Sequence, residues 1–266
     1  MKLDLTYGKL KQLLDVFWKE FLALFCVFNG TELFLEIQDS LLICFKSYIL
    51  QLMSKSQPDM MLSLLAVGSF IGPILLAVVV IVLGFLQPGY NHITQLMSEL
   101  GEAGAPNGVI MNIATAILGI SILLFAFSLL YELAKGTALK IGFILTLVAG
   151  ICMIGGGIFL CDPGCVPVSF QGTIHHTVSM IGFPAIIFAP FALSQQFKSS
   201  RLWQNYRIYS ILTGVFTAIL VPIYLSEIFK DWNGGIQRVM LGMLLVWMEV
   251  ISIKVFCIST GRTPKA

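Results

Sequence analysis

The sequence predicts an all-α polytopic membrane protein whose core is a bundle of six transmembrane helices. Of its 266 residues, 57% are hydrophobic and only 11% are charged, whereas a soluble domain carries about 25% charged residues. The charges are also unevenly placed, because residues 1–59 hold 13 of the 30 and the other 207 positions hold 17. This composition excludes a soluble enzyme, a disordered regulator and a nucleic-acid-binding protein, and the lipid bilayer is the expected partner.

Six continuous apolar runs follow Met60, each of about 22 residues or slightly more. A helix of that length crosses the ~30 Å hydrocarbon core at 1.5 Å per residue. A transmembrane β-barrel requires alternating apolar and polar residues instead, and these runs lack that alternation. The predicted spans are Leu62–Leu86, Val109–Tyr131, Leu139–Leu160, His176–Phe197, Ile208–Phe229 and Ile236–Ile258.

The distribution of Lys and Arg predicts how the spans are oriented. The first and third loops (87–108 and 161–175) contain neither residue. The second loop contains two lysines, and the fourth loop contains both Lys and Arg. Because basic residues favour the cytoplasmic side, both termini should be cytoplasmic and the first, third and fifth loops should face outward. The fifth loop, with Lys230 and Arg238, is the exception. We therefore expect a multi-pass protein of the cell (cytoplasmic) membrane, with a six-helix domain at 59–260 and a cytoplasmic tail at 261–266.

Residues 1–58 are predicted to form an amphipathic cytoplasmic extension without a spanning run. Apolar residues recur at helical spacing from Leu10 to Phe25 and again from Phe34 to Leu52, a pattern typical of helices that lie on a membrane surface. The alternative is that the native chain begins at Met53, because the residues after it read as a short cytoplasmic start before the first span.

The predicted orientation places most ionisable side chains of the membrane domain on its outward face. All three histidines and five of the seven acidic residues after position 60 lie in or beside the outward loops. Any site is therefore expected on the extracytoplasmic face. The histidines and acidic residues in or beside the outward loops are His92, His175, His176, Glu99, Glu102, Asp162, Glu227 and Asp231.

The first outward loop is predicted to turn at Pro88-Gly89 and then to form a short amphipathic helix from Asn91 or Thr94. On that helix His92 and Glu99 share a polar face. The simpler interpretation is a solvated face, because charged faces on surface helices are common. The functional alternative is a cluster of His and carboxylate side chains directed at the mouth of the bundle.

The third loop contains Cys161-Asp162-Pro163-Gly164-Cys165, which predicts a type II turn because Pro and Gly occupy its central positions. Such a turn brings its ends within the ~4.4–6.8 Å Cα separation of a disulfide, and the loop is predicted on the oxidising side. We favour a Cys161–Cys165 disulfide over free thiols, and both over a metal site shared with a histidine.

Two of the predicted spans, the fourth and the sixth, also carry candidate ionisable groups. His175 and His176 open the fourth span, where the helix dipole favours the neutral ring, which can bind a metal ion or accept a proton; the alternative is interfacial polar residues that contact water. Glu249 lies near the middle of the sixth span, where a carboxylate is costly and therefore a functional candidate, or else a protonated or hydrogen-bonded side chain between helices. Arg238, at the outer end of that span, is a candidate partner for an outward carboxylate such as Glu99 or Asp162.

Ordered motifs in the two outward loops carry a resemblance to a known family. They are Pro88-Gly89-Tyr90, Ser98-Glu99-Leu100-Gly101, Pro106, Gly157-Ile-Phe, Cys161-Asp-Pro-Gly-Cys165 and Gly172-x-x-His175. In these motifs the chain resembles the DUF998 family of prokaryotic multi-pass membrane proteins, from about Met60 to about Ser259. The sequence departs from the family where Asn91-His92 follows Tyr90, since the resemblance implies an acidic residue there. The resemblance implies a topology and candidate residues, and it implies no reaction.

Three functions are compatible with these residues. The first is a binding or transport-like role for a small molecule or lipid at a polar outward site that includes Glu99, Asp162 and His175. The second is a metal-assisted hydrolase of a lipid or amide, in which Asp162, His175 and His176, with His92 as a further candidate, bind zinc and Ser98 or Glu99 activates water. The third is an accessory subunit without a site of its own.

Overall fold

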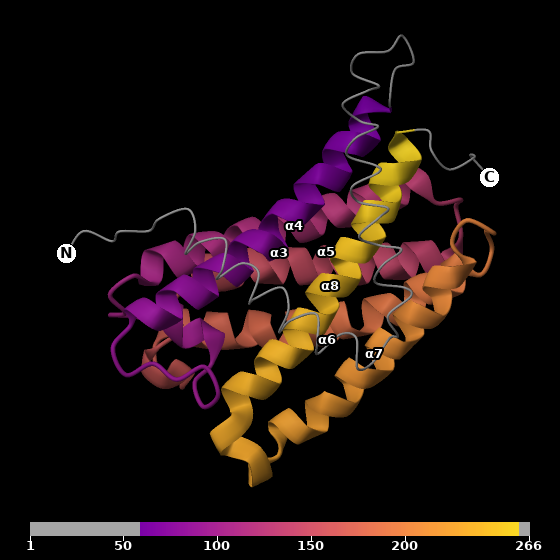
Figure 1. The fold of residues 1–266 in the computed structure, drawn as a ribbon. Coiled ribbons are helices and arrows are strands. Elements are labelled where there is room, and N and C mark those ends of the chain that lie inside the picture. The colour runs from indigo at the N-terminus through magenta and orange to yellow at the C-terminus, as the bar shows by residue number, and fades with distance from the viewer. Residues whose placement is uncertain (1–58, 261–266) are drawn as a thin grey trace, which may run out of the picture. The chain divides into compact units, whose positions relative to one another are not determined.

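The computed structural model describes residues 59–260, so the predicted extension (1–58) and tail (261–266) lie outside the described residues. Six helices are long and apolar enough to cross a membrane, which confirms the predicted all-α architecture of six spans. Three short 3-10 helices, η1 (Met97–Gly101), η2 (Pro163–Cys165) and η3 (Glu227–Trp232), lie in the connections. The six long helices, shown in Figure 1, are α3 (Met60–Leu86), α4 (Gly108–Glu132), α5 (Thr137–Ile158), α6 (Phe170–Phe197), α7 (Gln204–Leu225) and α8 (Asn233–Ser259).

Sequential helices pack against each other from α3 to α6, and α8 returns to pack against α3. The two ends of the domain are joined there, because the Asp59 amide donates to the Ser259 carbonyl at 3.1 Å. The hydroxyl oxygens of Ser63 and Ser259 lie 2.8 Å apart beside this bond. The helix α7 packs between α6 and α8.

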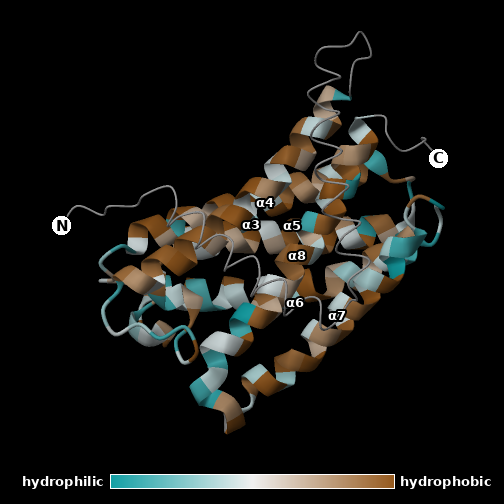
Figure 2. Ribbon diagram, in the orientation of Figure 1, coloured by the Kyte–Doolittle hydropathy of each residue, from teal (hydrophilic) through white to brown (hydrophobic). Residues whose placement is uncertain are grey.

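The bundle has two chemically different ends. The 3-10 end carries η1, η2 and η3 with the α3–α4, α5–α6 and α7–α8 connections. The basic end carries the α4–α5 and α6–α7 connections, with Lys135, Lys198 and Arg201. Figure 2 shows hydrophobic colour along the helices and hydrophilic colour concentrated in the connections. That the 3-10 end faces outward stays a prediction from the distribution of Lys and Arg.

Small residues allow close contact between neighbouring helices. A Cβ atom at Gly72 would lie 2.7 Å from the Leu118 Cα of α4, and the Gly72 amide donates to Ser121 Oγ at 2.9 Å. A Cβ atom at Gly157 would lie 2.6 Å from the Asn112 carbonyl oxygen. The glycines of α3 and α5 therefore bring both helices close to α4.

One helix begins earlier than its apolar run. The α6 helix starts at Phe170, six residues before the predicted span, because Ser169 Oγ accepts from the Gly172 amide at 3.0 Å and caps the helix. Its first turns are polar, so hydropathy does not register them. His175 consequently lies inside the second turn of α6, and the prediction that it occupies the helix N-terminus is wrong.

Candidate functional site

A cavity of about 90 Å³ lies inside the bundle, below η1. It extends over twelve residues on each of three helices, from Met111 to Ile122, from His175 to Ile186 and from Gln237 to Met248, which is about 16 Å at the helical rise. Among the described residues, α3, α4, α5, α6, α8 and η1 supply its lining and α7 supplies none. The lining residues are Leu76, Met97, Ser98, Met111, Asn112, Thr115, Ile122, Ala149, Cys152, Met153, Gly156, His175, Val178, Ser179, Gly182, Phe183, Ile186, Gln237, Leu241, Leu244, Leu245 and Met248.

The lining divides into a polar part and an apolar part. The polar part lies at the 3-10 end, because its helical members all fall within the first three turns of α4, α6 and α8. Toward the basic end the cavity wall is aliphatic or aromatic, as at Leu76, Ile186 and Met248. None of the described lining residues is Asp, Glu, Lys or Arg. The polar members are Ser98, Asn112, Thr115, His175, Ser179 and Gln237.

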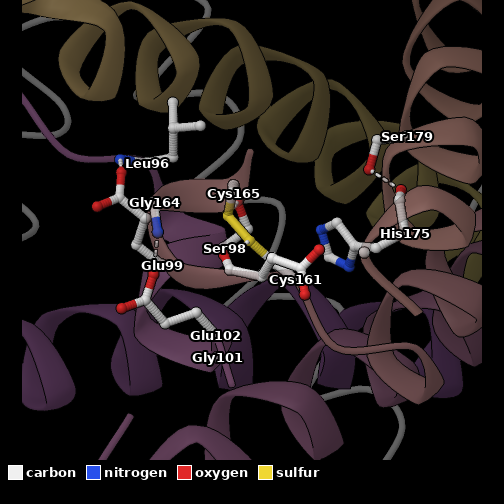
Figure 3. Close-up of a disulfide and its surroundings, with 12 residues drawn as sticks. Leu96, Ser98, Glu99, Gly101, Glu102, Cys161, Gly164, Cys165, His175 and Ser179 are labelled. Atoms are coloured by element: carbon white, nitrogen blue, oxygen red, sulfur yellow. Dashed lines mark hydrogen bonds between the residues drawn. A yellow bond between two sulfur atoms is a disulfide. The ribbon is translucent and has the colours of Figure 1, made fainter. Parts of the chain in front are cut away.

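His175 lines this cavity, and two backbone carbonyls select the tautomer of its ring. Its Nδ1 lies 3.1 Å from the Gly156 carbonyl oxygen and 2.9 Å from that of Phe159. Carbonyl oxygens only accept, so Nδ1 carries a proton, and in the neutral form of the ring Nε2 is the nitrogen with a lone pair. Within the described residues Nε2 has no hydrogen-bond partner, and Figure 3 shows the ring extending from α6 toward the disulfide. The end of α5 therefore fixes both the tautomer and the direction of the ring.

Other polar groups of the cavity also donate their hydrogens to backbone. Thr115 Oγ1 donates to the Met111 carbonyl at 2.9 Å, and Ser179 Oγ donates to the His175 carbonyl at 2.8 Å. Asn112 Nδ2 donates to the Gly101 carbonyl at 2.9 Å. Hydroxyl groups within helices commonly bond in this way to the preceding turn. These bonds leave available the lone pairs of the three side-chain oxygens and the second Nδ2 hydrogen of Asn112.

A disulfide between Cys161 and Cys165 covers the polar end of the cavity, with a Cα separation of 5.0 Å. The Cys165 amide donates to the Asp162 carbonyl at 2.7 Å, and Gly164 has φ of +65°, as the third residue of a type II turn requires. Ser98 Oγ, which lines the cavity, lies 3.2 Å from Cys165 Sγ. Figure 3 shows Ser98 beside the disulfide.

The acidic candidates bind backbone amides of the connections. Glu99 Oε1 accepts from the Leu96 amide at 2.7 Å, and Glu102 Oε2 accepts from the Gly164 amide at 2.7 Å and so ties the α3–α4 connection to the disulfide turn. Asp162 Oδ2 accepts from the amides of Val168 and Ser169, both at 2.7 Å. These bonds hold the pKa of Asp162 below its ordinary value. No carboxylate of the three lines the cavity.

Arg238 organises the α3–α4 connection through backbone oxygens. Its guanidinium donates to the carbonyls of His92 at 2.6 Å, Gln95 at 2.9 Å and Gly234 at 2.8 Å, and also to the Tyr90 hydroxyl. The predicted pairing of Arg238 with Glu99 or Asp162 is therefore wrong. The short helix predicted from Asn91 or Thr94 begins only at Met97, as the 3-10 helix η1, because the carbonyls of His92 and Gln95 are bonded to Arg238 of α8.

His92 lies apart from the cavity. Its ring packs edge-on against Phe85 and Tyr90, with centroid separations of 6.2 and 5.3 Å. Burial and the nearby Arg238 lower the pKa of His92. A Cβ atom at Gly84 would collide with this ring, so the glycine makes room for it. His92 and Glu99 consequently do not form the predicted cluster at the bundle mouth.

The structure does not bring the candidate zinc ligands together. Within residues 59–260, no group of three His, Cys, Asp or Glu side chains is placed to share a metal ion. His176 is exposed on α6, and the Asp162 carboxylate is bonded to backbone. The described residues therefore do not fit a site built from Asp162, His175 and His176.

Glu249 also lies outside the cavity lining. It is half-buried in α8, and its Oε1 is buried without a hydrogen-bond partner among the described residues. Next to it, the Trp247 indole donates to Ser210 Oγ of α7 at 2.8 Å. Its role stays a prediction.

Sequence reasoning selected His175 and Ser98 but missed the other polar lining residues. Asn112, Thr115 and Ser179 are single polar residues in apolar runs, and Gln237 lies at the start of one. The only available signal was that each lies within a few turns of the 3-10 end. Hydropathy does not reveal which of these side chains face inward.

A family model described as a protein of unknown function, DUF998, matches residues 70–254. The match includes all the lining residues of the cavity and the three connections at the 3-10 end. No curated protein and no solved structure matches the chain.

Proposed function

The chain belongs to the DUF998 family, and on the geometry of its cavity we propose that it binds a small amphipathic molecule inside the membrane-spanning bundle. The single observation that carries this proposal is the division of the cavity into an apolar part and a polar end with an available His175 Nε2. Ligand sites are typically apolar hollows with a few convergent polar groups. By the predicted orientation, the polar end faces outward.

The packing below the cavity favours binding over conduction through the bundle. Toward the basic end, Phe125 and Trp247 are fully buried and meet edge-on, with ring centroids 5.4 Å apart. Phe197 and Trp203 are stacked at 5.0 Å nearer that end. These rings fill the core where a through-path would have to continue. The cavity is therefore a pocket with one polar end.

The hydrolase alternative receives less support from the same geometry. Ser98 and His175 both line the cavity, as a nucleophile and its base would have to. However, Ser98 Oγ contacts the disulfide sulfur, and Asp162, which would orient the base, binds the amides of Val168 and Ser169. A binding role requires neither a free nucleophile at Ser98 nor a carboxylate that orients His175.

The test is to identify what the purified protein retains. Met153→Trp places a larger side chain in the cavity, whereas Ile151→Trp makes the same kind of change on the opposite, 56% exposed face of α5. Mass spectrometry of organic extracts should find an amphipathic small molecule with the wild-type protein and Ile151→Trp, and not with Met153→Trp. Equal retention by all three proteins, or no retained molecule in any, would argue against the proposal.

A further inference from the structure

The polar groups of the cavity also select the chemistry of the ligand, an inference that rests on the proposed binding function. We infer that the ligand is an uncharged molecule with an apolar chain and a hydroxyl group at its polar end, and that ethers, ketones, ammonium ions and carboxylates are discriminated against. The juxtaposition that carries this inference is a set of hydrogen-bond acceptors from α4 and α6, which includes the His175 Nε2, together with hydroxyl and amide donors of Ser98, Asn112 and Gln237 around a single small volume.

Four polar groups of the cavity already donate a hydrogen to the backbone, which leaves their lone pairs to accept. His175 Nδ1, Thr115 Oγ1, Ser179 Oγ and Asn112 Nδ2 each donate to a carbonyl at 2.8–3.1 Å. Among the described residues, these bonds leave as acceptors the His175 Nε2 of the neutral ring and the lone pairs of the three side-chain oxygens, and as a donor the second Nδ2 hydrogen of Asn112. The hydroxyl of Ser98 adds a second donor to the lining. A ligand oxygen without hydrogen can accept from these donors but leaves the His175 Nε2 unbonded, whereas a hydroxyl can also donate to it.

A hydroxyl can also accept from the amide of Gln237. Gln237 Oε1 accepts from the Met97 amide at 2.8 Å, which fixes the side chain and leaves its Nε2 hydrogens available. A hydroxyl oxygen can accept from Gln237 while its hydrogen is donated to an acceptor of α4 or α6. An ether or ketone forms only the first of these bonds, and an ammonium group forms only the second.

Charge is disfavoured by the composition of the lining. The described residues that line the cavity include no Lys, Arg, Asp or Glu. The nearest carboxylates, Glu99 and Glu102, are bonded to backbone amides of the loops. A buried charge without a counter-charge carries a large desolvation cost. Carboxylate and ammonium heads are therefore excluded for the same reason.

The volume limits the size of the ligand. A cavity of about 90 Å³ holds roughly six to nine water-sized groups, since each occupies ~10–15 Å³ on this measure. The cavity is also narrow relative to its length of about 16 Å along three helices. A slender chain of that size, with the hydroxyl at the 3-10 end, fits both limits.

Five probes of about nine non-hydrogen atoms each test the inference: 1-octanol, heptyl methyl ether, 2-octanone, protonated octylamine and nonane. Binding to the full chain in detergent micelles is measured from the shift in unfolding midpoint at matched micellar concentrations. We expect 1-octanol to bind at least about tenfold more tightly than each of the other four probes, because they lack part of the hydrogen bonding or carry a charge.

Two variants locate the selectivity. His175→Asn retains an amide that can donate to the α5 carbonyls but lacks an atom in the place of Nε2, and it should reduce the octanol-to-ether ratio to below about threefold. Thr115→Val removes an acceptor with little change of shape and should reduce the ratio in the same direction. Thr146→Val is the matched control, since Thr146 makes the same kind of bond, to the Gly142 carbonyl at 2.8 Å, outside the cavity lining.

The outcomes separate the two proposals. If all five probes bind wild type alike and Met153→Trp binds none, the binding function stands and the hydroxyl inference is overturned. Tightest binding of octylamine or 2-octanone would overturn the inference in the same way. If no probe shifts the wild-type midpoint, or if Met153→Trp responds as wild type does, both the function and the inference fail.

Discussion

The connections at the 3-10 end and the cavity below them use polar side chains in opposite ways. In the connections, Glu99, Glu102 and Asp162 each accept backbone amide hydrogens, so their charges are used to hold loops in place. In the cavity, His175 and Thr115 donate to backbone and leave acceptors available. The charged residues that stand out in the sequence are structural, and the available groups are neutral.

The physical reason is the state of the backbone in each region. Irregular loops have amide and carbonyl groups without helical partners, and side chains must bond them. Within helices the backbone is already bonded, so a hydroxyl adds a second bond to a carbonyl of the preceding turn and keeps its oxygen exposed. Substitutions in the connections should therefore change stability, and substitutions in the cavity should change binding.

The largest effect is expected from Arg238→Met. The substitution leaves the carbonyls of His92 and Gln95 without their partner and removes the bond to Tyr90, so it should lower the free energy of unfolding by roughly 3 kcal/mol or more. Thermal and denaturant unfolding in detergent measure the change. Lys230→Met, on an exposed residue of η3, is the control. A loss for Arg238→Met no greater than that of the control would break the comparison.

Removing the disulfide should have the next largest effect. The double substitution Cys161→Ser, Cys165→Ser opens a small closed loop and should lower the free energy of unfolding by about 2 kcal/mol in the chain-entropy account. Reduction of the wild-type protein by a thiol should give the same shift. The preference for 1-octanol over the ether should persist, and its loss would mean that the disulfide takes part in binding.

Gly172→Ala tests whether Asp162 is fixed by the start of α6. A Cβ atom at position 172 would collide with the Asp162 carboxylate. Overpacking of this kind lowers the free energy of unfolding by about 1–3 kcal/mol. In an Asp162→Ala background the collision is absent, so the same substitution should cost much less. Equal costs in the two backgrounds would show that the contact has no energetic consequence.

Acid should weaken the hydrogen bonds between the Asp162 carboxylate and the amides of Val168 and Ser169. Because the folded pKa of Asp162 lies below its ordinary value, its contribution to stability is complete above the ordinary carboxyl pKa of about 3.9 and is lost as the pH falls through the folded pKa. The unfolding midpoint of the wild type should therefore decrease more steeply below about pH 4 than that of Asp162→Asn. Parallel pH profiles of the two proteins would contradict this assignment.

The smallest effect on stability is expected in the cavity. Thr115→Val and Thr146→Val should each change the free energy of unfolding by less than about 1 kcal/mol, because each removes one bond to an already bonded carbonyl. Only Thr115→Val should alter the preference for the hydroxyl probe. A change of several kcal/mol with Thr115→Val would show that the cavity hydroxyls are structural too.

The six spans, the type II turn and the position of the disulfide cysteines could all be derived from the sequence, because each depends on neighbouring residues. Span prediction requires only a sum of hydropathy along the chain. The start of α6 at Phe170 was missed because its first turns are polar and a single cap at Ser169 decides it. The loop helix was predicted to begin too early, because α8, distant in sequence, binds the carbonyls of His92 and Gln95 that its first turn would have used.

Thr115 and Thr146 mark the limit of what the sequence determined. Each lies in an apolar run, and each donates its hydroxyl hydrogen to the carbonyl four residues earlier. The sequence by itself determined that both lie in spans, since hydropathy and the helical repeat are local properties. Only the tertiary structure decided that Thr115 lines a cavity with His175 while Thr146 is packed, because the direction of a side chain acquires meaning only when another helix faces it.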